Sequence, residues 1–174
     1  PAADLARRSA LVVVLEDLAN HDNVGGIFRN VRALAAPDPR FELPACVLLS
    51  PRCCDPLYRK ALRVSMGNAL HVPFATLEPW PAGLEALRGA DLLALTPSPD
   101  AVDIRSLDCP PGSGSVLILG TEGPGLASET VETVRRLGGR AVRIDIEPAA
   151  DSLNVSVACA VALHRLRDRR GGRA

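Results

Sequence analysis

The segment Val116-Leu-Ile-Leu-Gly120-Thr-Glu-Gly-Pro-Gly125-Leu decides the fold class of this 174-residue chain. Four consecutive apolar residues that run directly into a glycine-rich turn are typical of a buried strand ending at a corner. The same pattern of Val, Leu and Ile before a polar or glycine-rich break recurs along the chain. It predicts buried strands at Leu11–Leu15, Ala45–Leu49, Leu92–Leu95, Val116–Leu119 and Ala141–Ile146.

Helical periodicity fills most of the segments between these strands. Apolar residues recur there at intervals of three and four, as expected for helices that cover a sheet. Strands that alternate with helices predict an α/β fold with a parallel sheet flanked by helices. The predicted helices span Val24–Ala35, Pro56–Val64, Gly83–Arg88, Leu126–Leu137 and Leu153–Arg167.

The composition is that of an ordinary globular domain, with 47% hydrophobic and 23% charged residues. The longest apolar runs are far shorter than the roughly 20 residues that span a bilayer, so we predict no membrane segment and no signal peptide. Twenty basic and twenty acidic residues give zero net charge, which argues against nonspecific coating of nucleic acid. The five cysteines lack Cys-x-x-Cys spacing, so we expect reduced cytoplasmic thiols and no metal site.

Positive charge gathers in two stretches of the sequence. Arg52, Arg59, Lys60 and Arg63 lie close together, and the stretch from Arg165 to Ala174 holds five arginines against one aspartate. Both are candidate contacts for phosphate groups. Because Lys60 is the only lysine, an arginine-rich composition with solvated side chains is the alternative explanation.

The loop after the first predicted strand combines polar residues with glycines. In open parallel sheets ligands bind outside the carboxyl ends of the strands, so such loops are candidate sites. Gly25 and Gly26 lower the helix propensity of the following helix but allow a backbone or a ligand to approach closely. Asn23 and Arg29 flank them, and we expect both side chains to project toward the same side. A capped surface helix with an exposed arginine is the alternative.

The turn Gly120–Gly125 lacks the Gly-Lys-Ser/Thr of a phosphate-binding loop and reverses the glycine order of the dinucleotide fingerprint. Glu122 within it suits a cationic or hydroxyl-bearing group, with backbone amides contacting a small ligand. A simple strand-turn-helix corner would also explain the glycines.

The last loop, after Ala141–Ile146, places Ser152, Asn154 and Ser156 at an otherwise apolar helix start. We expect Ser152 to cap this helix and, with Asn154, to hold substrate. Capping and side-chain bonds to the backbone are the alternative role for these polar groups.

Three motifs, taken in order, resemble those of the SpoU (TrmH-like) family of SPOUT RNA methyltransferases: Asn23-x-Gly25-x-x-x-Arg29, Leu119-Gly120-x-Glu122-Gly123-x-Gly125 and Asp151-Ser152-Leu153-Asn154-Val155-Ser156. The resemblance runs from about residue 10 to residue 168 and includes the turn Ser65-Met66-Gly67. Its departures are Asn20-His21-Asp22, where Asn-Pro is frequent, Ile144-Asp145-Ile146, where Ile-Pro-Met is frequent, and Asn68, where a small apolar residue is common.

The resemblance implies a SPOUT-type parallel sheet with a C-terminal trefoil knot, S-adenosylmethionine as cofactor, and a homodimer. It implies methyl transfer to a ribose 2′-hydroxyl of tRNA or rRNA, with Arg29, Arg52, Arg59 and Arg63 as candidate RNA contacts. Arg29 would act on the hydroxyl, and Asn23, Glu122, Ser152 and Asn154 would arrange the site. The implied cofactor pocket is formed by Thr96, Gly120, Glu122, Gly125, Ile144 and Leu153.

The role of Arg29 has a physical constraint. A guanidinium group keeps its proton in proteins, so we favour Arg29 as a cation that binds a phosphate and stabilises developing oxyanion character, over Arg29 as a base. If the dimer is similar to that of the family, Arg29 of one subunit serves the cofactor of the other. The glycines at 25 and 26 and the apolar run Val155–Leu163 would suit burial against that second copy.

The expected domain organisation has three parts: residues 1–9 as a linker or tail of a missing N-terminal domain, residues 10–168 as the methyltransferase domain, and residues 169–174 as a basic flexible tail. A non-catalytic RNA-binding or assembly module on the same fold is the alternative function, but such a module could lose Arg29 or Asn154, and both are present. A nucleotide-binding α/β protein would be expected to contain a phosphate-binding loop, and the sequence contains no such motif.

Overall fold

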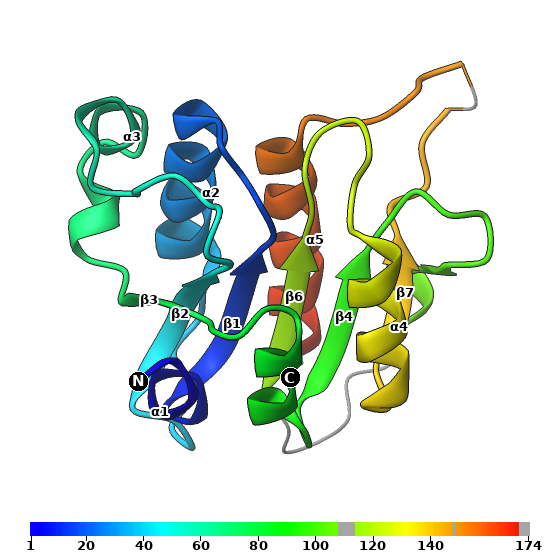
Figure 1. The fold of residues 1–174 in the computed structure, drawn as a ribbon, viewed down its shortest axis with the longest axis horizontal. Coiled ribbons are helices and arrows are strands. Elements are labelled where there is room, and N and C mark those ends of the chain that lie inside the picture. Colours follow the sequence, from blue (N-terminus) through cyan, green and yellow to red (C-terminus); the bar gives the residue numbers. More distant parts are fainter. Residues whose placement is uncertain (108–113, 148, 171–174) are drawn as a thin grey trace.

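The computed structural model describes residues 1–107, 114–147 and 149–170, with side chains to residue 167. In these residues seven strands form one sheet in the order β3-β2-β1-β6-β4-β7-β5, and each neighbouring pair is parallel (Figure 1). The predicted parallel α/β sheet is therefore confirmed. The strands are β1 (Ser9–Leu15), β2 (Leu43–Leu49), β3 (Phe74–Thr76), β4 (Asp91–Leu95), β5 (Val102–Asp103), β6 (Ser115–Leu119) and β7 (Arg140–Arg143).

Four of the five predicted helices are α-helices, and the helix Ala2–Arg7 was not predicted. The segment predicted as a helix at Gly83–Arg88 is a 3-10 helix, and the last predicted strand ends at Arg143, which leaves Ile144–Ile146 in a loop. Strands β3 and β5 were not predicted because they have only three and two residues. The helices are α1 (Ala2–Arg7), α2 (His21–Leu34), α3 (Arg59–Val64), η1 (Asn68–Leu70), η2 (Ala82–Leu87), η3 (Ile104–Ser106), α4 (Ser128–Arg136) and α5 (Val155–Arg170).

Strand β1, which pairs with β2 and with the central strand β6, is buried along its whole length because helices cover both faces of the sheet. Leu11, Val13 and Leu15 pack in one core with residues of α2 and α5, whereas Val12 and Val14 pack in a second core with residues of α1, η2 and α4. Figure 1 shows α5 behind the sheet and α4 in front of it. The domain therefore has three layers, with the sheet between two layers of helices. The helices cover the faces of the sheet but not the carboxyl ends of its strands.

Helix α2 approaches two other helices of the same chain at its glycines. A Cβ atom at Gly25 would lie 2.6 Å from the carbonyl oxygen of Ala61 in α3, and one at Gly26 would overlap Oγ of Ser156 in α5. The close approach that the glycines permit is thus made within the chain. The prediction that Gly25 and Gly26 pack against a second copy is therefore corrected: they pack against α3 and α5 of their own chain.

Helices occur within the segments predicted as linker and tail. Residues 1–9 contain α1, whose Ala6 is buried, and the first residue of β1. Helix α5 extends to Arg170, and residues 171–174 lie outside the described part, as does Cys109. Among the described residues, no helix is both long and apolar enough to cross a membrane.

Candidate functional site

An open pocket lies beyond the carboxyl ends of β4, β6 and β7. All six residues that the resemblance implied for the cofactor line it, and so does Ser152: Thr96, Gly120, Glu122, Gly125, Ile144 and Leu153. Neighbours that the sequence did not single out complete the lining: Leu95, Pro97, Leu119, Thr121, Gly123, Ile146, Val155 and Ala158. Most of these flank the motif residues directly in the chain, which is the signal that could have found them.

The glycine turn after β6 is closed on itself by its backbone. Thr121 and Gly125 exchange two hydrogen bonds, with N···O distances of 3.2 and 3.1 Å. A Cβ atom at Gly120 would overlap the backbone of Gly125 and Leu126, and the φ angles of Gly123 and Gly125 are +86° and +73°. The backbone geometry of this turn therefore requires its glycines, and the turn presents backbone groups to the pocket. A simple strand-turn-helix corner would not need all of these features.

Asn154 joins the three motifs. Its Oδ1 accepts hydrogen bonds from the backbone N–H groups of Ser156 (3.0 Å) and Val157 (3.3 Å), the geometry of a helix N-cap. Its Nδ2 donates to Oδ1 of Asn23 (2.9 Å) and to Oε1 of Glu122 (2.5 Å). One amide thus caps α5 and connects it to the start of α2 and to the glycine turn.

The prediction that Ser152 caps α5 is wrong, because Asn154 occupies the cap and Ser152 lies exposed in the pocket lining. Ser156 finds its partner on α2, where Nδ2 of Asn30 donates to the Ser156 carbonyl oxygen at 2.7 Å. Asn30 was not singled out from the sequence, since its partner lies 126 positions away.

Glu16 is a second connecting residue that sequence analysis missed. It lies just beyond β1 and is buried, with 4% of its surface exposed. Its carboxylate accepts hydrogen bonds from Thr130 Oγ1 (2.8 Å), Trp80 Nε1 (3.1 Å) and the backbone N–H of Ala127 (3.2 Å). Because Ala127 is the N-cap residue of α4, Glu16 connects the start of that helix to the end of β1.

Arg29 is not part of the pocket lining. Its side chain is exposed on α2 and has no polar partner among the described residues, whereas Asn23 is buried against Asn154. The expectation that the two project toward the same side is wrong, because six residues of an α-helix turn the direction by a net angle of about 120°. The structure therefore brings together Asn23, Glu122, Ser152 and Asn154, but places Arg29 on a different face.

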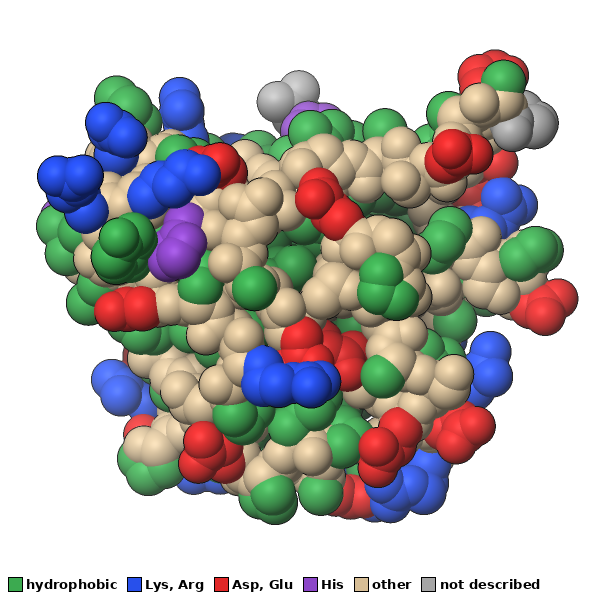
Figure 2. Space-filling model, turned by 45° about the horizontal axis from the view of Figure 1, so that its top comes forward, with side chains coloured by type: hydrophobic (Ala, Val, Ile, Leu, Met, Phe, Trp, Pro, Cys, Tyr) green, Lys and Arg blue, Asp and Glu red, His purple; other side chains and the backbone are tan. Residues whose placement is uncertain are grey.

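The three predicted RNA contacts of the first basic stretch differ in their pairing. Arg52 forms an ion pair with Asp17, a residue with a φ angle of +56°. Burial alone would raise the pKa of Asp17, but hydrogen bonds from Arg52 and Ser50 lower it. Arg59 and Arg63 are exposed without a polar partner in the described part of the chain. Figure 2 shows Lys and Arg side chains gathered at the corner of the molecule that holds α3.

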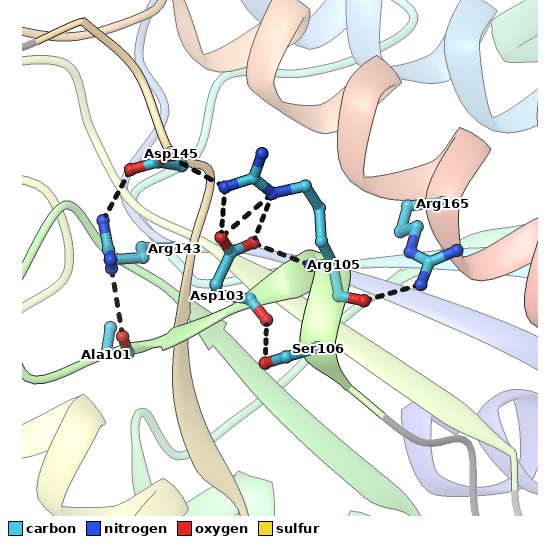
Figure 3. A network of polar contacts seen from close by, with 7 residues as sticks. All are labelled: Ala101, Asp103, Arg105, Ser106, Arg143, Asp145 and Arg165. Carbon is cyan, nitrogen blue, oxygen red and sulfur yellow. Dashed lines mark hydrogen bonds and ion pairs between the residues drawn. The ribbon is translucent and has the colours of Figure 1, made fainter.

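A network of arginines and aspartates anchors the loop that leaves β7 (Figure 3). Arg105 contacts both Asp103 (2.6 Å) and Asp145 (2.8 Å), and Arg143 contacts Asp145 (3.0 Å). Side-chain and backbone hydrogen bonds from Arg105 lower the pKa of Asp103 to about 2. Asp145 thus holds the start of the pocket loop. Arg165 donates to the carbonyl oxygen of Arg105 at 2.6 Å, so it stabilises the same network.

The described cysteines carry no disulfide, and burial raises the pKa of the thiols of Cys46 and Cys54 to about 11. Within the described ranges, no three His, Cys, Asp or Glu side chains gather as a metal site would require.

A family model described as the SpoU rRNA Methylase family matches residues 10–164. Among curated relatives, an uncharacterised tRNA/rRNA methyltransferase of Mycobacterium tuberculosis is 37% identical over 165 residues, covering 93% of this chain and 53% of its own length. One of Synechocystis is 30% identical over 158 residues, covering 90% and 53%. The chain therefore spans about half the length of these relatives.

Solved structures are similar over almost the whole chain. The AdoMet-bound rRNA methyltransferase of Sinorhizobium meliloti superposes with a TM-score of 0.75 at 26% identity, covering 92% of this chain and 56% of that one. The SpoU methyltransferase AviRb of Streptomyces viridochromogenes gives 0.74 at 26% identity, covering 99% and 66%.

Proposed function

Because the chain belongs to the SpoU rRNA methylase family, we propose that it transfers a methyl group from S-adenosylmethionine to a ribose 2′-hydroxyl of tRNA or rRNA. The observation that carries the proposal is the convergence of three motifs on one pocket through a single side chain. Asn154 bonds to both Asn23 and Glu122, although more than 100 residues separate it from Asn23.

The pocket suits this cofactor chemically. Leu95, Leu119 and Ile144 provide apolar walls for a purine ring, and the backbone of the glycine turn provides hydrogen-bonding groups. Glu122 offers a carboxylate to the hydroxyl or ammonium groups of the ligand. A methyl group at position 120 would fill part of the turn, which explains the glycine there. Thr96, Gly120, Glu122, Gly125, Ile144 and Leu153 would hold the cofactor.

Methyl transfer to a hydroxyl needs a near in-line approach of the oxygen and loss of the hydroxyl proton. When bound, S-adenosylmethionine supplies an electrophilic methyl group on a sulfonium. Positioning by a preformed site lowers the barrier by several kcal/mol. In this proposal Asn154 keeps Glu122 and the start of α5 in fixed relation. Arg29 binds the phosphate beside the target ribose and stabilises negative charge that develops on the 2′-oxygen.

Because Arg29 lies outside the pocket lining of its own chain, the proposal includes a homodimer in which another subunit supplies it. Two observations support this arrangement. Arg29 is absent from the pocket lining of its own chain. Helix α5 exposes Val157 and Val161, which are four residues apart and therefore share one face that a second copy could cover. A C-terminal knot also remains a prediction. The placement of β6 between β1 and β4, with α5 returning to α2 on one face, supports it.

Two measurements test the proposed function. Isothermal titration with S-adenosylhomocysteine should show binding that EDTA does not change, because the proposed pocket uses no metal. Mapping of 2′-O-methylation in total RNA, from cells with and without the intact gene, should then reveal a nucleotide that loses its methyl group. Binding without any lost methylation would favour a non-catalytic module, and no binding at millimolar ligand would contradict the proposal.

A further inference from the structure

Unpaired arginines cluster on two neighbouring helices. Within the described part of the chain, most arginines form an ion pair or a hydrogen bond to a carbonyl group. Of the six whose side chains have no such partner, one lies on α4 and one on α5, and four lie on α2 and α3: Arg29, Arg32, Arg59 and Arg63. All four are exposed. Because side chains without internal partners stay available to a ligand, this part of the surface is a candidate anion-binding face.

The helices place these cations around one junction. Gly25 of α2 meets Ala61 of α3, and Arg29 and Arg32 follow Gly25 by four and seven residues, so they share its side of α2. Arg59 and Arg63 are four residues apart and share one side of α3. Figure 2 shows the resulting gathering of positive side chains beside histidine and hydrophobic groups.

An exposed aromatic ring lies among these cations. Tyr58 directly precedes α3 and has 56% of its surface exposed. Its ring packs on the imidazole of His21, the first residue of α2, with 4.5 Å between the ring centroids. The ring is thus supported from within the protein while more than half of the residue faces solvent. Burial in the core does not explain a tyrosine in this position.

The acidic groups nearby are already engaged. Asp22 forms an ion pair with Lys60 at 2.7 Å, and Asp55 accepts the backbone N–H of Leu57 at 2.8 Å. The corner formed by His21, Arg29, Arg32, Tyr58, Arg59 and Arg63, called here the α2–α3 corner, therefore favours an anionic ligand. A second copy bringing the same corner would add like charges and be repelled.

We propose that the α2–α3 corner binds a single-stranded segment of the substrate RNA, with an unpaired base stacked on Tyr58 and its phosphates on Arg59 and Arg63. The proposal rests on the RNA methyltransferase function proposed above and specifies its substrate: a target flanked by unpaired nucleotides, as in a loop or bulge. In a duplex the base faces are covered by their neighbours, so a supported aromatic ring beside guanidinium groups recognises unstacked bases.

The test compares two fluorescein-labelled probes by anisotropy, a 12-nucleotide single-stranded RNA of mixed sequence and the matching 12-base-pair duplex. Tyr58→Ala should weaken single-strand binding about tenfold, the effect expected for loss of one stacked base, and leave duplex binding nearly unchanged. Tyr58→Phe keeps the ring and should stay within about twofold of the wild type. Equal losses for Tyr58→Ala and Tyr58→Phe, or for both probes, would overturn the stacking role.

Arg63→Ala tests the phosphate contact against a matched control. Arg135 on α4 is also exposed and unpaired in the described structure, but it lies on the opposite face of the sheet. Arg63→Ala should reduce the slope of log affinity against log salt by about 0.7, as expected for one lost phosphate contact on a single strand, and Arg135→Ala should not. Equal effects of the two variants would overturn the assignment of the corner.

Two further readouts separate this inference from the proposed function. Titration with S-adenosylhomocysteine should give wild-type affinity for Tyr58→Ala, since Tyr58 is not in the pocket lining. If methylation is found in cells but Tyr58→Ala binds the single strand like the wild type, the corner is refuted and the function stands. If Tyr58→Ala instead changes the sedimentation mass, the corner is a contact between copies and the proposal is overturned.

Discussion

Replacing Glu16 with alanine should destabilise the folded chain through the loss of one buried carboxylate. That carboxylate accepts three hydrogen bonds, from Trp80, Thr130 and the backbone of Ala127. Thr130 is fully buried, so its hydroxyl group gains no water when the acceptor is removed. The variant therefore leaves donors without partners as well as removing the bonds.

The magnitude follows from the number and type of these bonds. Hydrogen bonds to charged groups contribute about 1.5–3 kcal/mol each, but bonds that share one acceptor are not additive. We expect Glu16→Ala to lower the free energy of unfolding by about 4 kcal/mol, and the melting temperature by roughly 12 °C for a chain of this size. Glu16→Gln keeps one oxygen acceptor and should lose about half as much.

Urea unfolding followed by fluorescence measures this loss directly, because Trp80 is the only tryptophan and belongs to the network. Glu85→Ala is the control: Glu85 contacts Arg88 and Arg136 on the exposed surface, where ion pairs contribute little. Glu16→Ala should also weaken S-adenosylhomocysteine binding, since α4 holds the end of the glycine turn. A loss below about 1 kcal/mol, or one equal to that of Glu85→Ala, would refute the reasoning.

Three more predictions concern the pocket, the dimer and the loop network. Gly120→Ala should abolish measurable S-adenosylhomocysteine binding in calorimetry because its methyl group overlaps the turn backbone, while Gly138→Ala, strained but with open space around it, should retain binding. Arg29→Ala and Asn154→Ala should each be inactive alone, yet their mixture should recover roughly a quarter of wild-type methylation if subunits exchange randomly; no recovery despite demonstrated exchange would contradict the shared site. Asp103, with its pKa lowered to about 2 from 3.8, stabilises the fold fully above about pH 4 and loses that contribution as the pH falls toward 2. The stability difference between wild type and Asp103→Asn should therefore shrink over this interval in acid titrations, and a constant difference would count against the assigned pKa.

Local patterns in the sequence predicted the elements that are long and strongly apolar. Four of the five expected strands lie where they were predicted and the fifth ends three residues early, while the six residues implied for the cofactor line one pocket. Sequence reasoning failed where a residue acts through a distant partner. Glu16 bonds to Trp80, Ala127 and Thr130, and no local sequence pattern predicts contacts over such separations.

Competition between nearby polar residues explains a second kind of failure. Ser152 and Asn154 are both good capping residues, so preference alone could not choose between them. The helix begins at Val155, which puts Asn154 in the capping position and leaves Ser152 to the pocket. Gly25 and Gly26 of α2 led to a similar error. A glycine indicates that another helix packs closely, but the sequence does not show whether that helix belongs to the same chain or to a second copy.

The amide of Asn154 has consequences for how a ligand enters. Its two hydrogens are held by Asn23 and Glu122, and its oxygen accepts two backbone groups of α5. An amide offers two N–H donors, so both are committed before any ligand arrives. A carboxylate has two oxygens, so a ligand can bond to Oε2 of Glu122 while Oε1 keeps its 2.5 Å hydrogen bond from Asn154. Ligand entry would then add to this network rather than replace part of it, and the cap of α5 would keep its bonds in the filled pocket.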